Sequence, residues 1–171
     1  MAIVTEPKKP RKAPDSGPAN RILSALARYH EERGDIWMGE AEIGRKGIRV
    51  DLFTIKASWK PMPTIYEIKT SRADFFRDAK WTHYLPYCQR FYFATPPGLV
   101  RKEEVPDPRA GLVEVDANGQ VILIKPCKIM VPPAKNLHLM LHRLLFKYAF
   151  PLGGTKPVQP HEWNPWKKDQ R

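Results

Sequence analysis

Apolar and polar positions alternate along the middle of the chain with the period of a β-strand. Three segments show this pattern, at residues 36–43, 48–56 and 64–70. Gly44 and Gly47 bound a turn between the first two segments. Pro61 and Pro63 interrupt the chain before the third segment, because proline cannot continue a ladder of backbone hydrogen bonds. The pattern therefore predicts three strands in succession.

Helical spacing, with an apolar residue about every 3.6 positions, occurs before, between and after the strand patterns. It predicts helices at residues 20–33, 72–88 and 134–150. Asn20 has the side chain of a helix N-cap, and Gly34 is suited to end the first helix. Pro86 is expected to end or distort the last turn of the second helix.

The remaining elements complete an alternating order of helices and strands. Aromatic residues at 90–95 predict a strand, and residues 111–115 and 120–125 flank a hairpin turn at Asp116-Ala117-Asn118-Gly119. The order is helix, three strands, helix, strand, hairpin and helix. We therefore expect an α/β domain in which helices flank a mixed β-sheet.

The length of 171 residues is that of one domain, which we place at residues 19–150. Residues 1–18 are rich in proline, lysine and alanine and predict a disordered basic arm, and residues 151–171 predict a flexible tail. Two cysteines make no disulfide framework. Since no apolar run approaches the roughly 18 residues of a membrane span, we expect a cytoplasmic protein without membrane contact.

The formal net charge is +11, and most of it belongs to the central part of the chain. A basic domain attracts polyanions, and the most abundant of these is nucleic acid. DNA is therefore the expected partner. The alternative is a charged surface that serves only solubility.

The candidate chemistry lies on two of the predicted strands. Asp51 falls in the second strand, and Glu67 and Lys69 share one face of the third, roughly 7 Å apart. If the strands are neighbours, Asp51 faces Glu67, and two carboxylates about 4 Å apart repel each other by ~4 kcal/mol at an effective dielectric constant of 20. A divalent cation such as Mg²⁺ offsets this repulsion and activates water beside a phosphodiester.

A surface ion pair offers an alternative interpretation of the same residues. A Glu-x-Lys triplet is common on exposed sheet faces, where such pairs contribute little. The triplet alone favours this interpretation, so the assignment of a site depends on the surrounding order of elements.

That order, and several motifs within it, resemble a known family. The motifs are Glu67-Ile68-Lys69-Thr70-Ser71, Ala73-Asp74-Phe75, Asp78-Ala79-Lys80-Trp81, Tyr84, Tyr87-Cys88, Phe91-Tyr92-Phe93-Ala94 and Pro96-Pro97. They are similar to those of the MmcB-like DNA-repair family of the PD-(D/E)xK nuclease superfamily, over roughly residues 36–125. The resemblance implies a restriction-endonuclease-like core. In one departure from the superfamily pattern, Val50 stands where a proline precedes the motif aspartate.

The resemblance also implies roles for individual residues. Asp51 and Glu67 match the acidic metal ligands, and Lys69 matches the catalytic lysine. A further glutamate on the preceding strand is usual in such sites; Glu40 and Glu42 both qualify, and we favour Glu40. The implied cofactor is Mg²⁺ or Mn²⁺.

Residues of the following helix are expected beside this site. Lys80 and Tyr84, one helical turn apart, resemble the pair that lines the site in related nucleases. Arg72 and Arg77 flank the site and would bind phosphates, although a solvated face explains them equally well.

The sequence thus leads to a metal-dependent deoxyribonuclease acting in DNA repair or nucleic-acid processing. The alternative from another class is a non-cleaving DNA-binding module, or a subunit of a repair complex that retains the nuclease fold. The apolar stripe of residues 134–150 also suggests a protein partner or self-association, although packing in the core explains it as well.

Overall fold

The computed structural model describes residues 17–43, 48–56 and 58–149, with side chains as far as His142. Most of the expected arm at residues 1–18, the turn at 44–47 and the tail at 151–171 lie outside the described residues.

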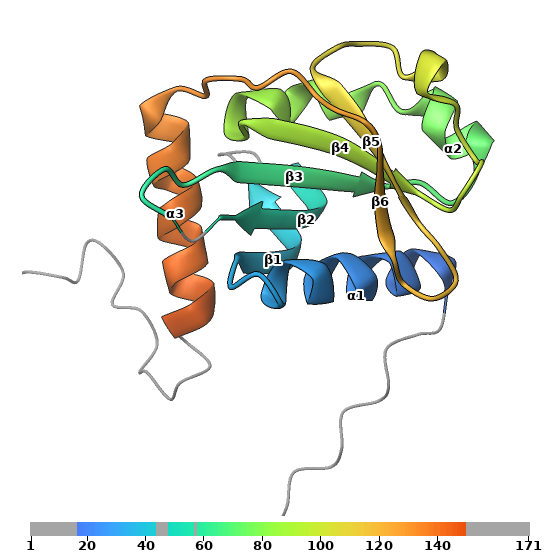
Figure 1. Cartoon of the computed structure of the whole chain (residues 1–171). Coiled ribbons are helices and arrows are strands. Elements are labelled where there is room, and N and C mark those ends of the chain that lie inside the picture. The colour runs from blue at the N-terminus through green and yellow to red at the C-terminus, as the bar shows by residue number, and fades with distance from the viewer. Residues whose placement is uncertain (1–16, 44–47, 57, 150–171) are drawn as a thin grey trace, which may run out of the picture.

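Six strands form one mixed sheet whose spatial order follows the chain, from β1 to β6. The strands are β1 (Ile36–Ile43), β2 (Ile48–Ile55), β3 (Pro63–Ile68), β4 (Arg90–Thr95), β5 (Ala110–Val115) and β6 (Val121–Lys125). The first three are antiparallel, β3 to β5 are parallel, and β6 returns antiparallel along β5 (Figure 1). The expected mixed sheet is confirmed, and the predicted strand bounds differ from the observed ones by at most two residues.

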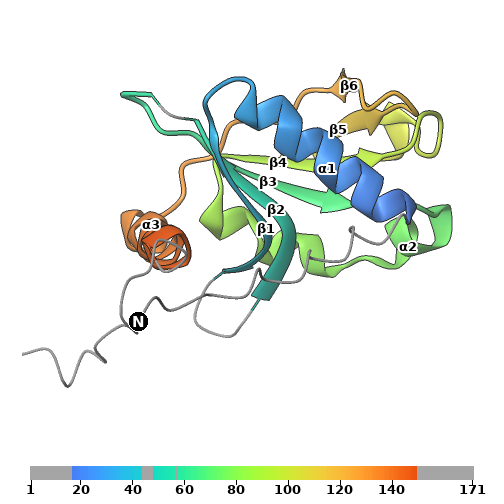
Figure 2. The same ribbon diagram turned by 90° about the horizontal axis from the view of Figure 1, so that it is seen from below.

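Helices cover both faces of the sheet. The longer ones are α1 (Pro18–Glu31) and α3 (Ala134–Ala149), and the shorter ones are α2 (Arg72–Arg77) and the 3₁₀ segments η1 (Lys80–His83), η2 (Leu85–Tyr87) and η3 (Lys102–Glu104). Helix α1 lies along one face, and α2 with η1 and η2 lies on the other, while α3 stands beside one end of the strands (Figures 1 and 2). No helix of the described ranges is long and apolar enough to cross a membrane.

Two apolar cores follow from this layering. The core under α1 joins Leu26 to Leu52 and Ala94, and the core on the opposite face joins Trp81 to Phe91 and Phe93. In the second core the rings stack or meet edge to face, with centroids 5.0 to 5.9 Å apart. Such aromatic pairs contribute beyond their buried area, so this core fixes α2, η1 and η2 against the sheet.

Helix α1 begins earlier than the sequence predicts. Gly17 occupies the N-cap and Pro18 the first helical position, while Asn20 lies inside the helix. Proline suits the first turn because its missing N–H has no helical partner there, and this outweighs the capping preference of Asn20. The other end agrees with prediction, since Gly34 adopts a φ of +70° after the last turn.

The continuous helix predicted at residues 72–88 is wrong. Helix α2 ends at Arg77, because Asp78 has an extended backbone (φ −76°, ψ 101°), and two 3₁₀ segments follow. The Asp78 carboxylate accepts the Lys80 N–H at 2.8 Å and turns inward to Lys69. A tertiary contact therefore overrides the helical periodicity, and Pro86 then lies within the second 3₁₀ segment.

The β1–β2 hairpin bends at its centre. Glu40 has a φ of +49°, which non-glycine residues seldom adopt. Strict alternation would place Met38 and Ala41 on opposite faces, yet both pack in the core beneath α2. On β2 the alternation of faces is also interrupted at Asp51, because Val50 packs in this core as well. The bend thus lies where Glu40 stands opposite Asp51 in the register.

Helix α3 packs through its first half. Met140 is fully buried, and Leu137 and Leu141 are half-buried. The rest of the apolar stripe, at residues 143–149, has its side chains outside the described part. The suggestion that this helix binds a partner stays a prediction.

Candidate functional site

Asp51 and Glu67 meet where β2 and β3 run side by side. The two residues come one step beyond the registered pair Leu52 and Tyr66, so they occupy opposed positions on neighbouring strands. The Asp51 Oδ2 atom accepts the backbone N–H of Ile68 at 2.7 Å. This bond ties the Asp51 carboxylate to the end of β3, so the predicted proximity of Asp51 and the Glu67 strand is present in the structure.

Glu67 is a buried carboxylate with one satisfied oxygen. Its side chain is 12% exposed, and its Oε1 accepts from the Lys69 ammonium at 3.2 Å. Its Oε2 is buried and has no hydrogen-bond partner among the described residues. Burial, and next the charge of Asp51, raise the pKa of Glu67 to about 7. One oxygen of Glu67 therefore lacks a hydrogen-bond donor, while Lys69 pairs with the other.

Asp51 has a raised pKa for the same chief reason. Burial is the largest cause, and the N–H of Ile68 and the charge of Lys69 oppose it. Asp51 and Glu67 are thus two carboxylates that both resist ionisation when no cation is bound. Such a pair is suited to a cation that stabilises both charged forms.

Lys69 lies at the centre of three carboxylates. Its side chain is 7% exposed, and its Nζ lies 2.8 Å from Asp78 Oδ2, 3.2 Å from Glu67 Oε1 and 3.6 Å from Asp74 Oδ2. Burial lowers the pKa of Lys69, but contact with Asp78 and Glu67 outweighs burial and holds the pKa above its ordinary value. Lys69 is therefore a fixed positive charge at this site.

Asp74 and Asp78 lie at the site, but the sequence pattern did not predict a functional role for either. They come from α2 and from the residue that ends it, and they bracket the Lys69 ammonium. Ser71 caps α2 by accepting the Asp74 N–H at 3.2 Å, which orients this turn. The available signal was two aspartates four residues apart, soon after a lysine that ends a strand.

The structure places Tyr84 at the site and leaves Lys80 at its outer edge. Tyr84 is buried, and its pKa is raised by burial and then by the charges of Glu67 and Asp78. Lys80 is exposed at the start of η1, and its backbone N–H bonds to Asp78. Among the described residues, the Lys80 ammonium forms no hydrogen bond or ion pair with the site carboxylates. Lys80 begins η1 and Tyr84 lies between η1 and η2, so the two residues do not share one helix.

The upstream glutamates lie on the exposed side of the bend. Glu40 is opposite Asp51, and its charge contributes to the raised pKa of Asp51, yet its side chain is 66% exposed and pairs with Arg49 at 2.5 Å. Glu42 is exposed as well. In the described part of the chain, no three His, Cys, Asp or Glu side chains gather as a metal-binding group. Asp51 and Glu67 suit a hard cation, and a third protein ligand from Glu40 would require it to leave Arg49.

Arg72 and Arg77 make contacts within the protein. Arg72 forms a two-pronged pair with Glu104 at 2.6 and 3.1 Å and donates to the Leu99 carbonyl at 2.9 Å. Arg77 donates to the Ala73 carbonyl at 3.2 Å. Arg72 therefore joins α2 to η3, and its role toward phosphate stays a prediction.

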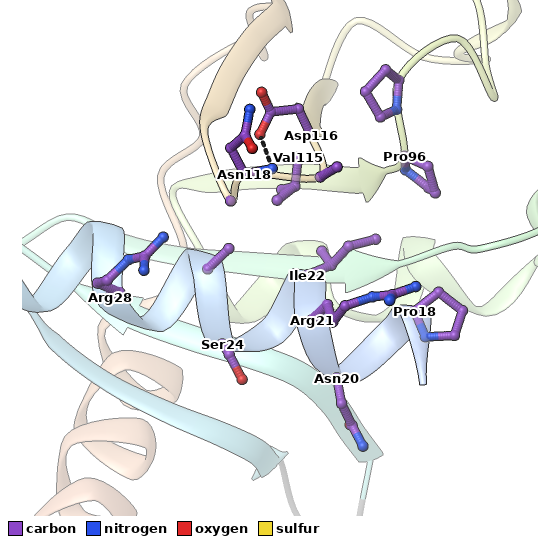
Figure 3. Close-up of a pocket in the computed structure, with 14 residues that line it drawn as sticks. Pro18, Asn20, Arg21, Ile22, Ser24, Arg28, Pro96, Val115, Asp116 and Asn118 are labelled. Carbon is purple, nitrogen blue, oxygen red and sulfur yellow. Dashed lines mark hydrogen bonds between the residues drawn. The ribbon is translucent and has the colours of Figure 1, made fainter. Parts of the chain in front are cut away.

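A large hollow lies elsewhere on the molecule. It has a volume of about 580 Å³ and lies between α1 and the β5–β6 turn, where Pro18, Arg21 and Asn118 line it (Figure 3). The Asp116 carboxylate accepts the Asn118 N–H at 2.9 Å and shapes this turn. Neither Asp51, Glu67 nor Lys69 lines the hollow, so its size does not make it the site of the carboxylate chemistry.

Comparison with known proteins agrees with the fold and identifies the family. A family model described as DNA repair protein MmcB-like matches residues 9–149. The SPO1766 protein of unknown function from Silicibacter pomeroyi has a similar fold, with a TM-score of 0.66 and 24% identity, over 81% of this chain and 90% of that one. No curated protein matches. Because the family model spans most of the 171 residues, the chain belongs to the MmcB-like family of DNA repair proteins.

Proposed function

We propose that this protein is a Mg²⁺- or Mn²⁺-dependent deoxyribonuclease that hydrolyses DNA phosphodiesters during repair. The observation that carries the proposal is the buried, partnerless Oε2 of Glu67 beside the Asp51 carboxylate, in a protein of a DNA repair family. A buried polar atom without a hydrogen-bond partner is costly, even though Lys69 pairs with the other oxygen of Glu67. A divalent cation held by Asp51 and Glu67 removes this cost.

Some side chains of the site bind the cation, and another stabilises the charge on the phosphate. The cation, when bound, supplies an activated water and neutralises charge on the phosphate. Asp51 and Glu67 hold the cation, with the Ile68 N–H orienting Asp51. Lys69, which stays protonated, stabilises the charge that develops on the phosphate oxygens. Its raised pKa makes it unsuited to removing a proton from water.

The decisive experiment is a cleavage assay with the full chain and labelled DNA in several forms. Plasmid, duplex, single-stranded and nicked DNA are incubated with Mg²⁺ or Mn²⁺, beside the variants Glu67→Gln and Lys69→Met. We expect both substitutions to abolish cleavage. Glu31→Gln, an exposed carboxylate on α1, is the matched control and is expected to keep full activity. Equal cleavage by all variants would show that the activity comes from elsewhere or from a contaminant.

Metal binding is measured separately from activity. Isothermal calorimetry with Mn²⁺ is expected to show binding to the wild-type chain and to Glu31→Gln, and a large loss in Asp51→Asn and Glu67→Gln. Retained Mn²⁺ affinity in both site variants would remove these carboxylates from the metal site.

The second candidate function is a DNA-binding module that does not cleave. The enclosure of Lys69 by Asp74, Asp78 and Glu67 favours this candidate, because a lysine so fully paired has few N–H groups left for a substrate. Salt-sensitive DNA binding without metal-dependent cleavage on any of the substrates above would select it.

A further inference from the structure

A second hollow lies on the opposite face of the sheet from the carboxylate site. It has a volume of about 530 Å³ and is lined by the end of α1 and by side chains of β2 to β6. Tyr66 lines it, whereas the next residue, Glu67, belongs to the carboxylate site. Successive residues of a strand point to opposite faces, so β3 separates the two places, and they share no residue.

Positive charge dominates the rim of this second hollow. Arg33, Lys56 and Arg90 line it against one carboxylate, Asp35. Asp35 is already engaged, since its Oδ2 lies 2.8 Å from His30 Nδ1. Within the described ranges, the side chains of Lys56 and Arg90 form neither an ion pair nor a hydrogen bond. Two cations without counter-ions beside a cavity are suited to an anion, and phosphate is the common one.

Aromatic and aliphatic side chains form part of the wall of the hollow. The rings of Tyr66 and Tyr92 stack with centroids 5.7 Å apart and an angle of 21°. Tyr29 adds a third ring, over which the Arg33 guanidinium lies at 3.5 Å from the centroid. Val121 and Leu123 of β6 complete the wall. Tyr66 and Tyr92 are only 6% and 8% exposed, so Tyr29 and the β6 side chains offer most of the surface that a nucleobase can contact.

A chain of buried hydrogen bonds fixes the position of Tyr66 in the lining of the hollow. The pKa of His30 is lowered by burial, so its ring is neutral at physiological pH. Its Nδ1–H donates to Asp35, and its Nε2, 2.9 Å from the Tyr66 hydroxyl, accepts from it. The chain from Asp35 through His30 to Tyr66 links the end of α1 to the middle of β3. The cavity is therefore formed before any ligand binds, which reduces the entropic cost of binding.

We propose that this second hollow binds a nucleoside monophosphate, either free or as the terminal nucleotide of a DNA strand. The phosphate contacts Arg90 and Lys56, and the base lies against the tyrosine and aliphatic wall. The volume lies in the range of about 300–1,000 Å³ that is typical of small-ligand sites. The proposal concerns binding alone and does not depend on cleavage at Asp51 and Glu67.

The test is an NMR titration of the ¹⁵N-labelled full chain in EDTA, so that metal and cleavage play no part. Deoxyadenosine monophosphate, deoxyadenosine, inorganic phosphate, and oligonucleotides with or without a 5′-phosphate are added separately. We expect the monophosphate to shift the amide signals of Arg90, Tyr66 and Leu123, while those of Asp74 and Asp78 stay in place. A preference for the 5′-phosphorylated oligonucleotide would identify a strand end as the source, and a response to the free monophosphate but to neither oligonucleotide would identify the free nucleotide.

Variants provide an independent check. Lys56→Gln and Arg90→Gln are each expected to weaken binding roughly tenfold, because charge-assisted hydrogen bonds are about twice as strong as neutral ones. Lys102→Gln, an exposed lysine on η3, is the control and is expected to bind as wild type does. No shift with any nucleotide, shifts centred on the carboxylate site, or unchanged affinity in Lys56→Gln, which is exposed and tolerates substitution, would overturn the proposal. If inorganic phosphate binds as tightly as the nucleotide, the proposal that the wall binds a base is wrong.

Discussion

Glu67 is the residue whose ionisation the fold resists most clearly at the site. Its pKa rises from 4.5 to about 7, because burial removes water from the carboxylate and Asp51 adds a like charge. A carboxyl whose pKa is higher in the folded protein binds its proton more tightly there than in the unfolded chain. Its contribution to stability is therefore complete below pH 4.5 and is lost as the pH rises toward 7.

This pH dependence predicts how Glu67→Gln changes the free energy of unfolding. The amide cannot ionise, so the variant gains stability relative to wild type as the pH rises, by on the order of 2 kcal/mol at pH 8, and gains none from this source at pH 4.5. Urea unfolding across this pH range, in EDTA, measures the difference. A difference that is constant with pH would contradict the assignment of the raised pKa to Glu67.

Adding Mn²⁺ at pH 8 is expected to reverse the order of stability, since the cation stabilises the ionised carboxylates of the wild type alone. An equal Mn²⁺ effect on both proteins would place cation binding elsewhere. This comparison also separates metal binding from cleavage.

Lys69 holds several negative charges together, which predicts a large structural effect of its removal. Lys69→Met keeps the length of the side chain and leaves Glu67 and Asp78 buried without their cation. Removing one partner of a buried ion pair costs about 3–5 kcal/mol, and we expect a loss in this range by denaturant unfolding at pH 8. Lys102→Met, whose ion pair with Glu103 is exposed, is the control and should change stability by less than about 1 kcal/mol.

At the scale of elements, the bend in the β1–β2 hairpin puts a glutamate where glycine fits best. Glycine adopts a positive φ without steric cost, whereas other residues lose about 1 kcal/mol or more there. Glu40→Gly is therefore expected to be neutral or to stabilise the protein by up to about 1 kcal/mol, despite the loss of the exposed pair with Arg49. Thermal unfolding measures the change.

Glu42→Gly is the matched control on the same strand. It lies beyond the bend in regular pairing with Arg49, so glycine there should destabilise by about 1 kcal/mol. Equal losses at both positions would mean that Glu40 is not held in the left-handed region. If Glu40→Gly also keeps Mn²⁺ affinity, Glu40 is not a metal ligand.

Elements that follow from local pattern were predictable, and those set by tertiary contacts were not. Strand alternation predicted Glu67 and Lys69 on one face, and the Lys69 ammonium, from the residue just after β3, contacts the Glu67 carboxylate. The break of the helix at Asp78 depends on its contact with Lys69, nine residues earlier in the chain, which periodicity does not register. The positive φ of Glu40 has no sequence signal either, since glutamate rarely adopts it.

At the scale of the whole molecule, the net charge of +11 predicts how the protein binds DNA. Each phosphate neutralised releases counter-ions, so the logarithm of the affinity should fall linearly with the logarithm of salt concentration, with a slope of about −0.9 per phosphate contacted. Fluorescence anisotropy with labelled duplex DNA, in EDTA and at several salt concentrations, measures the slope. Glu67→Gln should leave the slope unchanged, and a slope near zero in wild type would argue against phosphate contacts.

Because Tyr66 and Glu67 lie on opposite faces of β3, the protein should tolerate insertions and deletions poorly in this strand. An insertion of one residue between them would exchange the faces of everything that follows in the strand, and both the carboxylate pair and the tyrosine-lined hollow would lose a member at once. The exposed loop at residues 58–61 belongs to neither site. Natural variants of this protein should therefore gain and lose residues in the loop, while β3 accepts substitutions only.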